Sequence, residues 1–464
     1  MKIRGLLVML LILMGLAAFV YFYEIEGGKK RTEEEKTQKK ILQVEEPKIQ
    51  EIAIFHGDEQ VRGRRLNSVW SIVAPVETEA DQYEWNAMSR ALQDLSKDKE
   101  IEAGAAELSS FGLDKPRVRV ALKGTDGKEQ QVLFGDDNPT QSFIYVKVDQ
   151  DPRVYLVASY SFRLFDKKFF DLRDKGVFKL DQAQVEEVLL RNPDGTISLK
   201  KKGDDWEMDS PIQARADKAE VDSLLSSLNG SSAKEIIDQP EAGLKTGLDQ
   251  PVYELKVVTG KERAMKRLLV GGLKSPVPSG TEKAGEKPAE VPADATFYAR
   301  DESRKPLLVV DKSFVDKLAK KAADLRDKSI VKMDRSKLKQ LEIVSGTENI
   351  VLVKSGEDWL TPDKKKKAKA ELVSTLLSGI EYGKAKSLLD PPFDAAKMGL
   401  DKPEVKLIIE QEGLPRQELW WGKEADDGSY LQLSGEKTVK VVEKDLRGKI
   451  ALKATDLLID NKQP

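Results

Sequence analysis

Three six-residue strings recur along the chain: FGLDKP at Phe111–Pro116, TGLDQP at Thr246–Pro251 and MGLDKP at Met398–Pro403. Glycine adopts a positive φ angle more readily than any other residue, and proline fixes the backbone where a new element begins. The string therefore predicts a turn followed by the start of a strand, with the aspartate accepting nearby backbone N–H bonds. The shared positions are Gly112, Leu113, Asp114 and Pro116; Gly247, Leu248, Asp249 and Pro251; and Gly399, Leu400, Asp401 and Pro403.

Other residues recur around each of these strings. A tryptophan precedes each string by about 40 residues, namely Trp70, Trp206 or Trp359. A strand-like run that ends in glycine follows each string, and these glycines are Gly135, Gly271 and Gly422. Trp206 lies 136 residues after Trp70, and Ala216-Asp217 lies the same number after Ala80-Asp81. One offset shared by several anchors is the signature of an internal repeat.

The ends of the repeats are also alike. Asp171–Lys175 and Asp324–Lys328 both read DLRDK, and the third copy keeps only Asp456-Leu457. We therefore divide the 464 residues into repeat units at 41–177, 178–330 and 331–464. The second unit is longer because of residues 275–296, rich in Pro, Gly, Ala and Glu, which we predict to be an exposed, mobile insertion.

The periodicity within a unit predicts an α+β fold of mostly antiparallel sheet with two helices, one in the middle and one at the end. Asp81 is expected to cap a helix whose apolar residues follow at helical spacing, namely Trp85, Met88, Leu92 and Leu95. After each glycine-containing string the apolar period becomes two, which is typical of half-buried strands. These positions are Val118, Val120 and Leu122; Tyr253, Leu255 and Val257; and Val405, Leu407 and Ile409.

The N-terminus predicts a membrane anchor at residues 1–23. Gly5–Tyr23 carries no charge, follows Lys2 and Arg4, and ends in aromatic residues, as expected for one transmembrane helix. A cleaved signal peptide is the alternative, although its apolar part is normally shorter. Residues 24–40 are highly charged and read as a spacer. We expect an inner-membrane, single-pass protein whose ectodomain lies on the periplasmic or extracellular side.

Composition excludes several kinds of chemistry. The chain has no cysteine and one histidine, His56, so thiolate metal sites, iron–sulfur clusters and histidine-paired metal sites are excluded. The net charge of −2 provides no global attraction for nucleic acid. No nucleotide-binding, metalloprotease or nucleophile-elbow motif occurs. The sequence therefore predicts no catalytic residues, cofactor or metal, and the oligomeric state stays open.

A few residues are candidates for partner contact. Trp420 and Trp421 are adjacent, so in a strand one ring is expected on each face of the sheet, and one ring is a candidate for contact with a partner. Lys364, Lys365, Lys366 and Lys367 form a basic run that is either a solvated surface or a contact for an acidic partner or anionic lipid. The three repeated tryptophans are assigned to the core in preference to sugar stacking. The repeated aspartates could alternatively be ligands or bases. Arg173, Asp174, Arg326 and Asp327 are expected to join one unit to the next through ion pairs.

Taken together, these motifs resemble the bacterial domain-of-unknown-function family numbered 4340, as tandem copies over nearly all of residues 41–464. The match is clear in the first two units and weaker in the third, which lacks the Ala-Asp and Arg-Asp-Lys elements. The resemblance implies a membrane-anchored envelope protein associated with ABC-type transporters, and it implies no catalytic residues.

The sequence thus favours a non-enzymatic, membrane-anchored ectodomain that is a scaffold or accessory subunit of a bacterial envelope complex, such as an ABC transporter. Two alternatives remain: a module that binds an envelope glycan or peptide, and a hydrolase that uses paired carboxylates.

Overall fold

The computed structural model describes residues 13–16, 21, 35–101, 105–149, 151–274 and 291–460. Most of the expected membrane span and most of the charged spacer lie outside this set, as does most of the expected insertion, at residues 275–290. Within the described residues, every helix is too short or too polar to cross a membrane. The chain forms two compact units, one ending at Gly176 and including Ser232–Ile236, the other comprising Val177–Ser231 and the rest of the chain.

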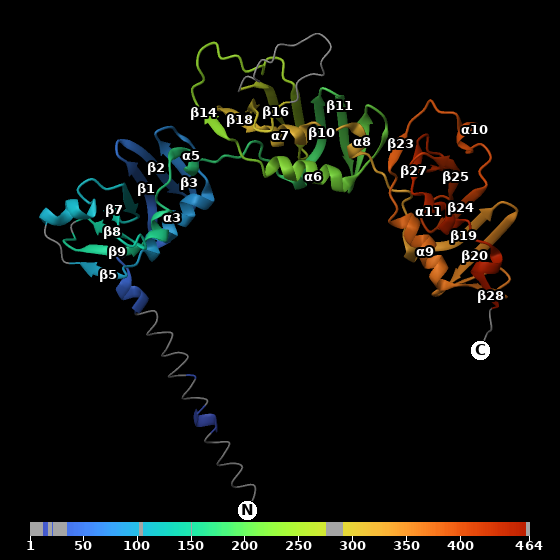
Figure 1. Cartoon of the computed structure of the whole chain (residues 1–464), viewed down its shortest axis with the longest axis horizontal. Helices are drawn as coiled ribbons and strands as arrows, with labels where there is room; N and C mark the ends of the chain where they lie inside the picture. The colour runs from blue at the N-terminus through green and yellow to red at the C-terminus, as the bar shows by residue number, and fades with distance from the viewer. Residues whose placement is uncertain are drawn as a thin grey trace, which may run out of the picture. The chain divides into compact units, whose positions relative to one another are not determined.

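The first repeat is a nine-stranded antiparallel sheet (Figure 1). Its strands, in spatial order, are β4 (Thr78–Glu79), β3 (Val69–Ala74), β2 (Glu59–Leu66), β1 (Ile49–His56), β6 (Val118–Gly124), β7 (Glu129–Asp137), β8 (Phe143–Val148), β9 (Val154–Ala158) and β5 (Lys99–Ile101). Its helices are η2 (Glu46–Lys48), α3 (Gln82–Asp94), η3 (Ala105–Phe111), α4 (Ser159–Phe162) and α5 (Phe169–Leu172).

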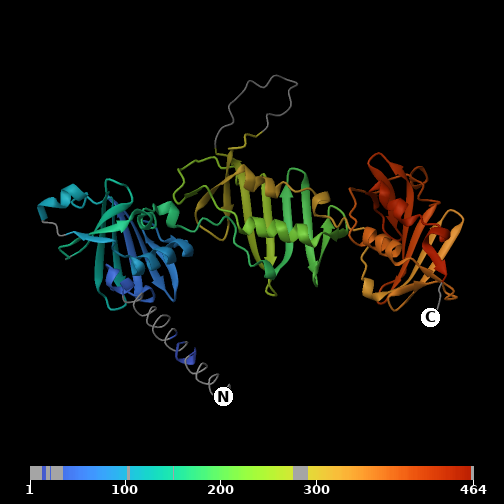
Figure 2. The same ribbon diagram turned by 60° about the horizontal axis from the view of Figure 1, so that its bottom comes forward.

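The second repeat has the same strand order, and Figure 2 shows its helix α6 lying across the strands of the sheet. The strands are β13 (Ala214–Ala216), β12 (Asp205–Ser210), β11 (Gly195–Lys202), β10 (Val185–Asn192), β15 (Tyr253–Thr259), β16 (Ala264–Leu273), β17 (Thr296–Asp301), β18 (Leu307–Asp311) and β14 (Glu235–Ile237). The helices are η4 (Gln182–Gln184), α6 (Lys218–Asn229), α7 (Lys312–Leu318) and α8 (Ala322–Leu325).

The third repeat keeps this order and adds one strand at the edge. The strands are β28 (Leu458–Asp460), β22 (Lys366–Ala368), β21 (Asp358–Leu360), β20 (Glu348–Ser355), β19 (Leu338–Ser345), β24 (Val405–Gln411), β25 (Gln417–Ala425), β26 (Gly428–Leu433), β27 (Val439–Val442) and β23 (Ser387–Leu389). The helices are η5 (Arg335–Lys337), α9 (Ala370–Glu381), α10 (Ala395–Met398), α11 (Lys444–Ile450) and α12 (Ala454–Leu457). The expected α+β class is confirmed, and the three sheets share one topology.

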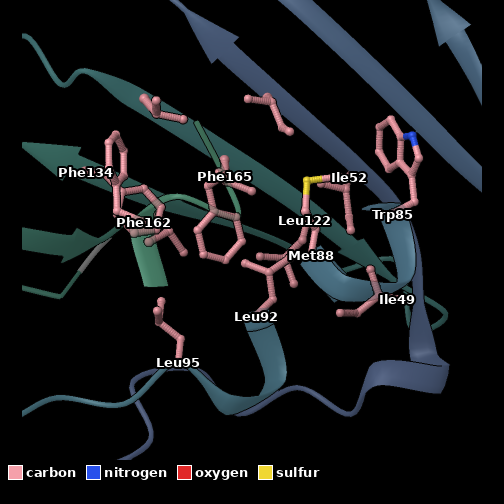
Figure 3. Close-up of a cluster of buried hydrophobic side chains, with 14 of the residues drawn as sticks. Ile49, Ile52, Trp85, Met88, Leu92, Leu95, Leu122, Phe134, Phe162 and Phe165 are labelled. Carbon is pink, nitrogen blue, oxygen red and sulfur yellow. The ribbon is translucent and has the colours of Figure 1, made fainter. Parts of the chain in front are cut away.

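The middle helix of each repeat packs on one face of its sheet. In the first repeat, Trp85, Met88 and Leu92 of α3, and Leu95 directly after it, are buried in one cluster with residues of β1, β6 and β7, as the helical spacing predicts (Figure 3). Asp81 caps α3 by accepting from the N–H groups of Tyr83 and Glu84, and Asp217 caps α6 in the same way. The third repeat has Lys369 at this position and makes no side-chain cap. The counterpart of the Ala-Asp pair in the third repeat is therefore Ala368-Lys369.

The final helix of each repeat is split in two, where the sequence predicts one. In the first repeat α4 and α5 are separate, and in the second α7 and α8. The break follows from the aspartate that begins each DLRDK motif. Asp171 Oδ2 accepts from the N–H of Lys168 at 2.9 Å, and Asp324 Oδ2 accepts from the N–H of Lys321 at 2.8 Å. Each aspartate thus starts a new helical turn rather than continuing the old one.

The glycine-containing strings pack on the sheet face opposite the middle helix. Gly112, Gly247 and Gly399 have φ angles of +66°, +69° and +71°, which confirms the predicted left-handed turn. The turn places its leucine in a second, smaller core: Leu248 lies with Leu269, Tyr298, Leu307 and Val309. In the first repeat Leu113 is buried, and Phe111 contacts Tyr145 with ring centroids 4.6 Å apart.

This packing depends on a glycine in the second strand after each turn, namely in β7, β16 or β25. A Cβ on Gly135 would lie 2.1 Å from the carbonyl oxygen of Phe111, one on Gly271 2.1 Å from that of Thr246, and one on Gly422 2.2 Å from that of Met398. The register of the strand pair shifts at this point in all three repeats. Each strand glycine therefore admits the backbone of the turn onto the sheet.

Replacing Gly422 with alanine should destabilise the third repeat. The new methyl group forces the Met398 carbonyl away, which we expect to lower the free energy of unfolding by about 1–3 kcal/mol. Gly448→Ala is the matched control, because Gly448 lies in α11 of the same repeat with nothing within 4 Å of its Cβ position. Urea unfolding of both variants checks this; equal stability would contradict it.

Candidate functional site

The repeated tryptophans belong to the cores. Trp70, Trp206 and Trp359 are at most 7% exposed, which leaves no ring face for sugar stacking. Trp70 stacks on Trp85 with ring centroids 5.3 Å apart, and its indole N–H donates to Asn86 Oδ1 at 3.1 Å. The core assignment made from the sequence agrees with this placement.

The repeated aspartates lie apart from any site. Asp114, Asp249 and Asp401 are exposed, and in the described part of the chain none of them makes a side-chain hydrogen bond or ion pair. The backbone bonds expected for them are therefore not formed. Three separate exposed carboxylates do not converge on a common ligand, and the structure offers no explanation for their recurrence.

The arginine of the second DLRDK motif clamps the third repeat. Arg326 is 6% exposed, and its two terminal nitrogens bind Asp390 Oδ2 at 2.7 Å and Asp390 Oδ1 at 3.0 Å. The same guanidinium donates to Thr438 Oγ1 at 3.0 Å. A bidentate arginine–carboxylate pair is stronger and more directional than an ordinary ion pair. The predicted joining role of Arg326 is thus realised by residues 64 and 112 positions away.

The neighbouring aspartate fixes the backbone at the same junction. The N–H of Asp327 donates to the Arg215 carbonyl at 3.0 Å, and Asp327 Oδ1 accepts from the N–H of Ser329 at 2.8 Å. In the first repeat Asp174 repeats this arrangement, because its N–H donates to the Glu79 carbonyl and its Oδ1 accepts from the N–H of Gly176. Arg173 is 2% exposed and lies over the Phe169 ring at 4.7 Å.

A cavity of about 410 Å³ opens at the junction between the second and third repeats. Lys384 Nζ lies 3.0 Å from Asp217 Oδ2 and Lys332 Nζ lies 2.8 Å from Asp205 Oδ2, so lysines of the third repeat meet the second. Sequence reasoning missed this cavity, because its residues come from three separate segments, within 205–218, 327–333 and 381–384. Its lining includes Asp205, Trp206, Glu207, Arg215, Asp217, Asp327, Lys332, Glu381 and Lys384.

The acidic residues of this junction cavity are neutralised by cations. Glu207 pairs with Lys202, Asp327 with Arg215, and Glu381 with Arg335. The hydrogen bond from Lys332 lowers the pKa of Asp205. Carboxylates with lowered pKa values stay ionised at neutral pH, which suits ion pairing better than proton donation.

Asp217 shows two opposing influences. Burial acts to raise the pKa of Asp217, but the hydrogen bond and charge of Lys384, with the N–H groups of Glu220 and Ala219, outweigh burial and leave this pKa lowered. The hydrogen bond to Asp217 correspondingly raises the pKa of Lys384. Asp217 therefore both caps α6 and holds the third repeat.

The two adjacent tryptophans are split between the faces of the third sheet, as alternation predicts. Trp421 is fully buried, whereas Trp420 lies on the other face, half-buried, with its N–H donating to Glu418 Oε2 at 3.2 Å. Lys406 Nζ lies 5.9 Å from the centroid of the Trp420 ring. Only Trp420 is therefore available to a partner.

The basic run lies elsewhere on the same sheet. Lys364 and Lys365 are exposed between β21 and β22. Lys366 and Lys367 begin β22, and four strands lie between β22 and β25 in the sheet order. Lys367 Nζ pairs with Asp358 at 2.7 Å, and Lys365 Nζ lies 4.0 Å from Asp363. The structure does not bring this run together with Trp420. Among the described residues no cluster of His, Asp or Glu could hold a metal ion.

Removing the Arg326 clamp should weaken the junction. Arg326→Ala leaves Asp390 without its partner, so we expect the free energy of unfolding to fall by about 1–3 kcal/mol. Arg416→Ala removes an arginine that is about half-exposed and pairs with three glutamates, and should cost less than about 1 kcal/mol. Urea unfolding distinguishes the two; equal losses would show that Arg326 is not a clamp.

The Lys384–Asp217 pair should make the junction sensitive to acid. Its stabilisation is present above the ordinary aspartate pKa and is lost as pH falls through the lowered value, below about pH 4. Because Lys384 is 63% exposed, Lys384→Met should cost at most about 1 kcal/mol at pH 7. This difference from the unsubstituted protein should shrink in acid, as measured by unfolding between pH 7 and pH 3. Lys365→Met is the control, and a pH-independent difference contradicts the assignment.

Comparison with known proteins identifies the family and little else. The model of a domain of unknown function (DUF4340) matches residues 70–251, 206–277 and 289–403. No curated protein matches the chain. Among solved structures, a DnaN sliding clamp (DNA polymerase III subunit beta) from Pseudomonas aeruginosa bound to griselimycin is similar at 9% identity and a TM-score of 0.13, over 86% of this chain and 92% of that one. A score this low carries no argument about fold or function. The family matches span more than half of the sequence, in three copies, and the chain belongs to the DUF4340 family.

Proposed function

We propose that this protein is a non-enzymatic, membrane-anchored scaffold or accessory subunit of a bacterial envelope complex. The observation that supports this most strongly is the use of the recurring residues. The tryptophans fill cores, the glycines admit a turn onto the sheet, and Arg326 joins the second repeat to the third. The recurring tryptophans and glycines and the arginine of the second DLRDK motif thus serve packing and joining.

The junction supports the same proposal. A scaffold must hold its parts together while their outer surfaces bind other molecules. The Arg326 clamp and the Lys384–Asp217 pair together connect two sheets of one topology. Each sheet keeps its own surface side chains, such as Trp420, for contact.

The apolar run Gly5–Tyr23 supports attachment to the inner membrane. We propose that the N-terminus stays in the cytoplasm and that the repeats lie outside it, because Lys2 and Arg4 precede the run. An ABC-type transporter is the partner that we propose to test first.

Affinity purification of the full chain from gently solubilised membranes should recover envelope membrane proteins in constant ratio, including a transporter permease or ATPase. A tagged, unrelated single-span protein controls for detergent-borne contaminants. A fusion of alkaline phosphatase to the C-terminus should be active, because the enzyme needs export. Repeated recovery of the chain alone would count against the scaffold, and an inactive fusion against the exported orientation.

A further inference from the structure

One hairpin of the first repeat ends in exposed apolar side chains. β2 and β3 are joined by Asn67 and Ser68, and Leu66 and Val69 face each other directly across the hairpin. Leu66 is 73% exposed and Val69 58% exposed. Trp70, the next residue, points into the core, so Leu66 and Val69 lie on the opposite face of the hairpin. The core therefore gains nothing from their apolar character.

The same hairpin is polar in the other two repeats. Its ends are Lys202 and Asp205 in the second repeat, and Ser355 and Asp358 in the third. Because the three sheets share one strand order, these pairs occupy the position of Leu66 and Val69. The fold therefore tolerates charged side chains at this position. The apolar character of Leu66 and Val69 is not explained by the needs of the fold.

This tip lies where the chain reaches the first sheet. β1 starts at Ile49, and its antiparallel neighbours β2 and β6 finish at that same end of the sheet. A cavity of about 440 Å³ is lined jointly by Pro47, Asn67, Ser68 and Thr125. Thr125 in turn donates its N–H to the Lys48 carbonyl at 2.9 Å.

The distance along the chain to the expected membrane span is short. Residues 24–48 separate Tyr23 from β1, a stretch that covers about 37 Å when helical. The tether therefore keeps this end of the first sheet close to the bilayer, where a weak contact gains from a high effective concentration.

Basic side chains surround the tip. Arg90 is exposed and, within the described part of the chain, makes no ion pair, and it lines the same cavity as Asn67 and Ser68. Arg64, with its side chain 58% exposed, and Lys48, 59% exposed, each have one acidic partner. Long basic side chains beside a small apolar tip suit an anionic lipid surface, since the stems lie on acyl chains while the charges reach head groups.

We infer that the Leu66–Val69 tip inserts into the head-group region of the bilayer beside the N-terminal anchor. This inference rests on the proposed membrane attachment. Two apolar residues on a two-residue turn are far too small for a stable protein interface, which buries about 1,200–2,000 Å². They suffice for a tethered lipid contact, whose strength scales with buried apolar area.

The absence of cysteine from the chain allows a clean test. Leu66→Cys, carrying an environment-sensitive fluorophore, is placed in the full chain in nanodiscs of phosphatidylethanolamine and phosphatidylglycerol that contain a nitroxide-labelled lipid. We expect strong quenching and a blue-shifted emission. Ser355→Cys, the same hairpin position in the third repeat, is the matched control and should show neither. Val69→Cys should behave like Leu66→Cys.

A label at Leu11→Cys, inside the expected span, distinguishes the proposed membrane anchor from the proposed contact of the tip with lipid. Quenching at Leu11 without quenching at Leu66 keeps the anchor and overturns the tip contact. No quenching at either position overturns both. If the Leu66 label is unquenched in nanodiscs but is shielded in native membranes, the tip binds a protein and the lipid inference is wrong.

Discussion

The approach of a turn carbonyl to a strand glycine is the constraint on which each repeat depends. The Phe111, Thr246 and Met398 carbonyls occupy space that a side chain on Gly135, Gly271 or Gly422 would fill. The approach requires a left-handed glycine in the turn, because the chain must reverse within a few residues of the strand. It also delivers a leucine into the second core. One backbone contact thus explains why two glycines about 23 residues apart and a leucine recur together.

The sequence predicts much of the local structure. Regular spacing identified the buried stripe of α3 and the strands β6, β15 and β24, because period and burial are linked within one element. Asp81 was recognised as a cap, since the cap bonds reach only two or three residues along the chain. The second core was not predicted, because Leu248 meets Leu307 and Val309 across about 60 residues. The split final helix was missed because the bond from Asp171 competes with helix continuation, and spacing alone does not show this.

The candidate site was predicted only in part, because its contacts join residues that are far apart in the sequence. The motif identified Arg326 as a joining residue, but its partners Asp390 and Thr438 belong to no motif. The alternation of a strand split Trp420 from Trp421, yet it could not say which ring is buried. Which of the two rings is buried depends on which face of the sheet α9 packs against, and this is decided by tertiary structure. The junction cavity, lined by charged residues from both repeats, leaves no local pattern.

The differences between the repeats are more informative about function than their similarities. Apart from the exposed Asp114, Asp249 and Asp401, the recurring positions are held by cores, turns and the junction, so they are not free to bind a partner. Where the repeats differ at exposed positions, the fold imposes no choice, and selection for a contact can act. Leu66 with Val69 and the half-buried Trp420 are such positions. If each of the three repeats of a scaffold binds a different partner, each partner contact should therefore lie at exposed positions where one repeat differs from the other two.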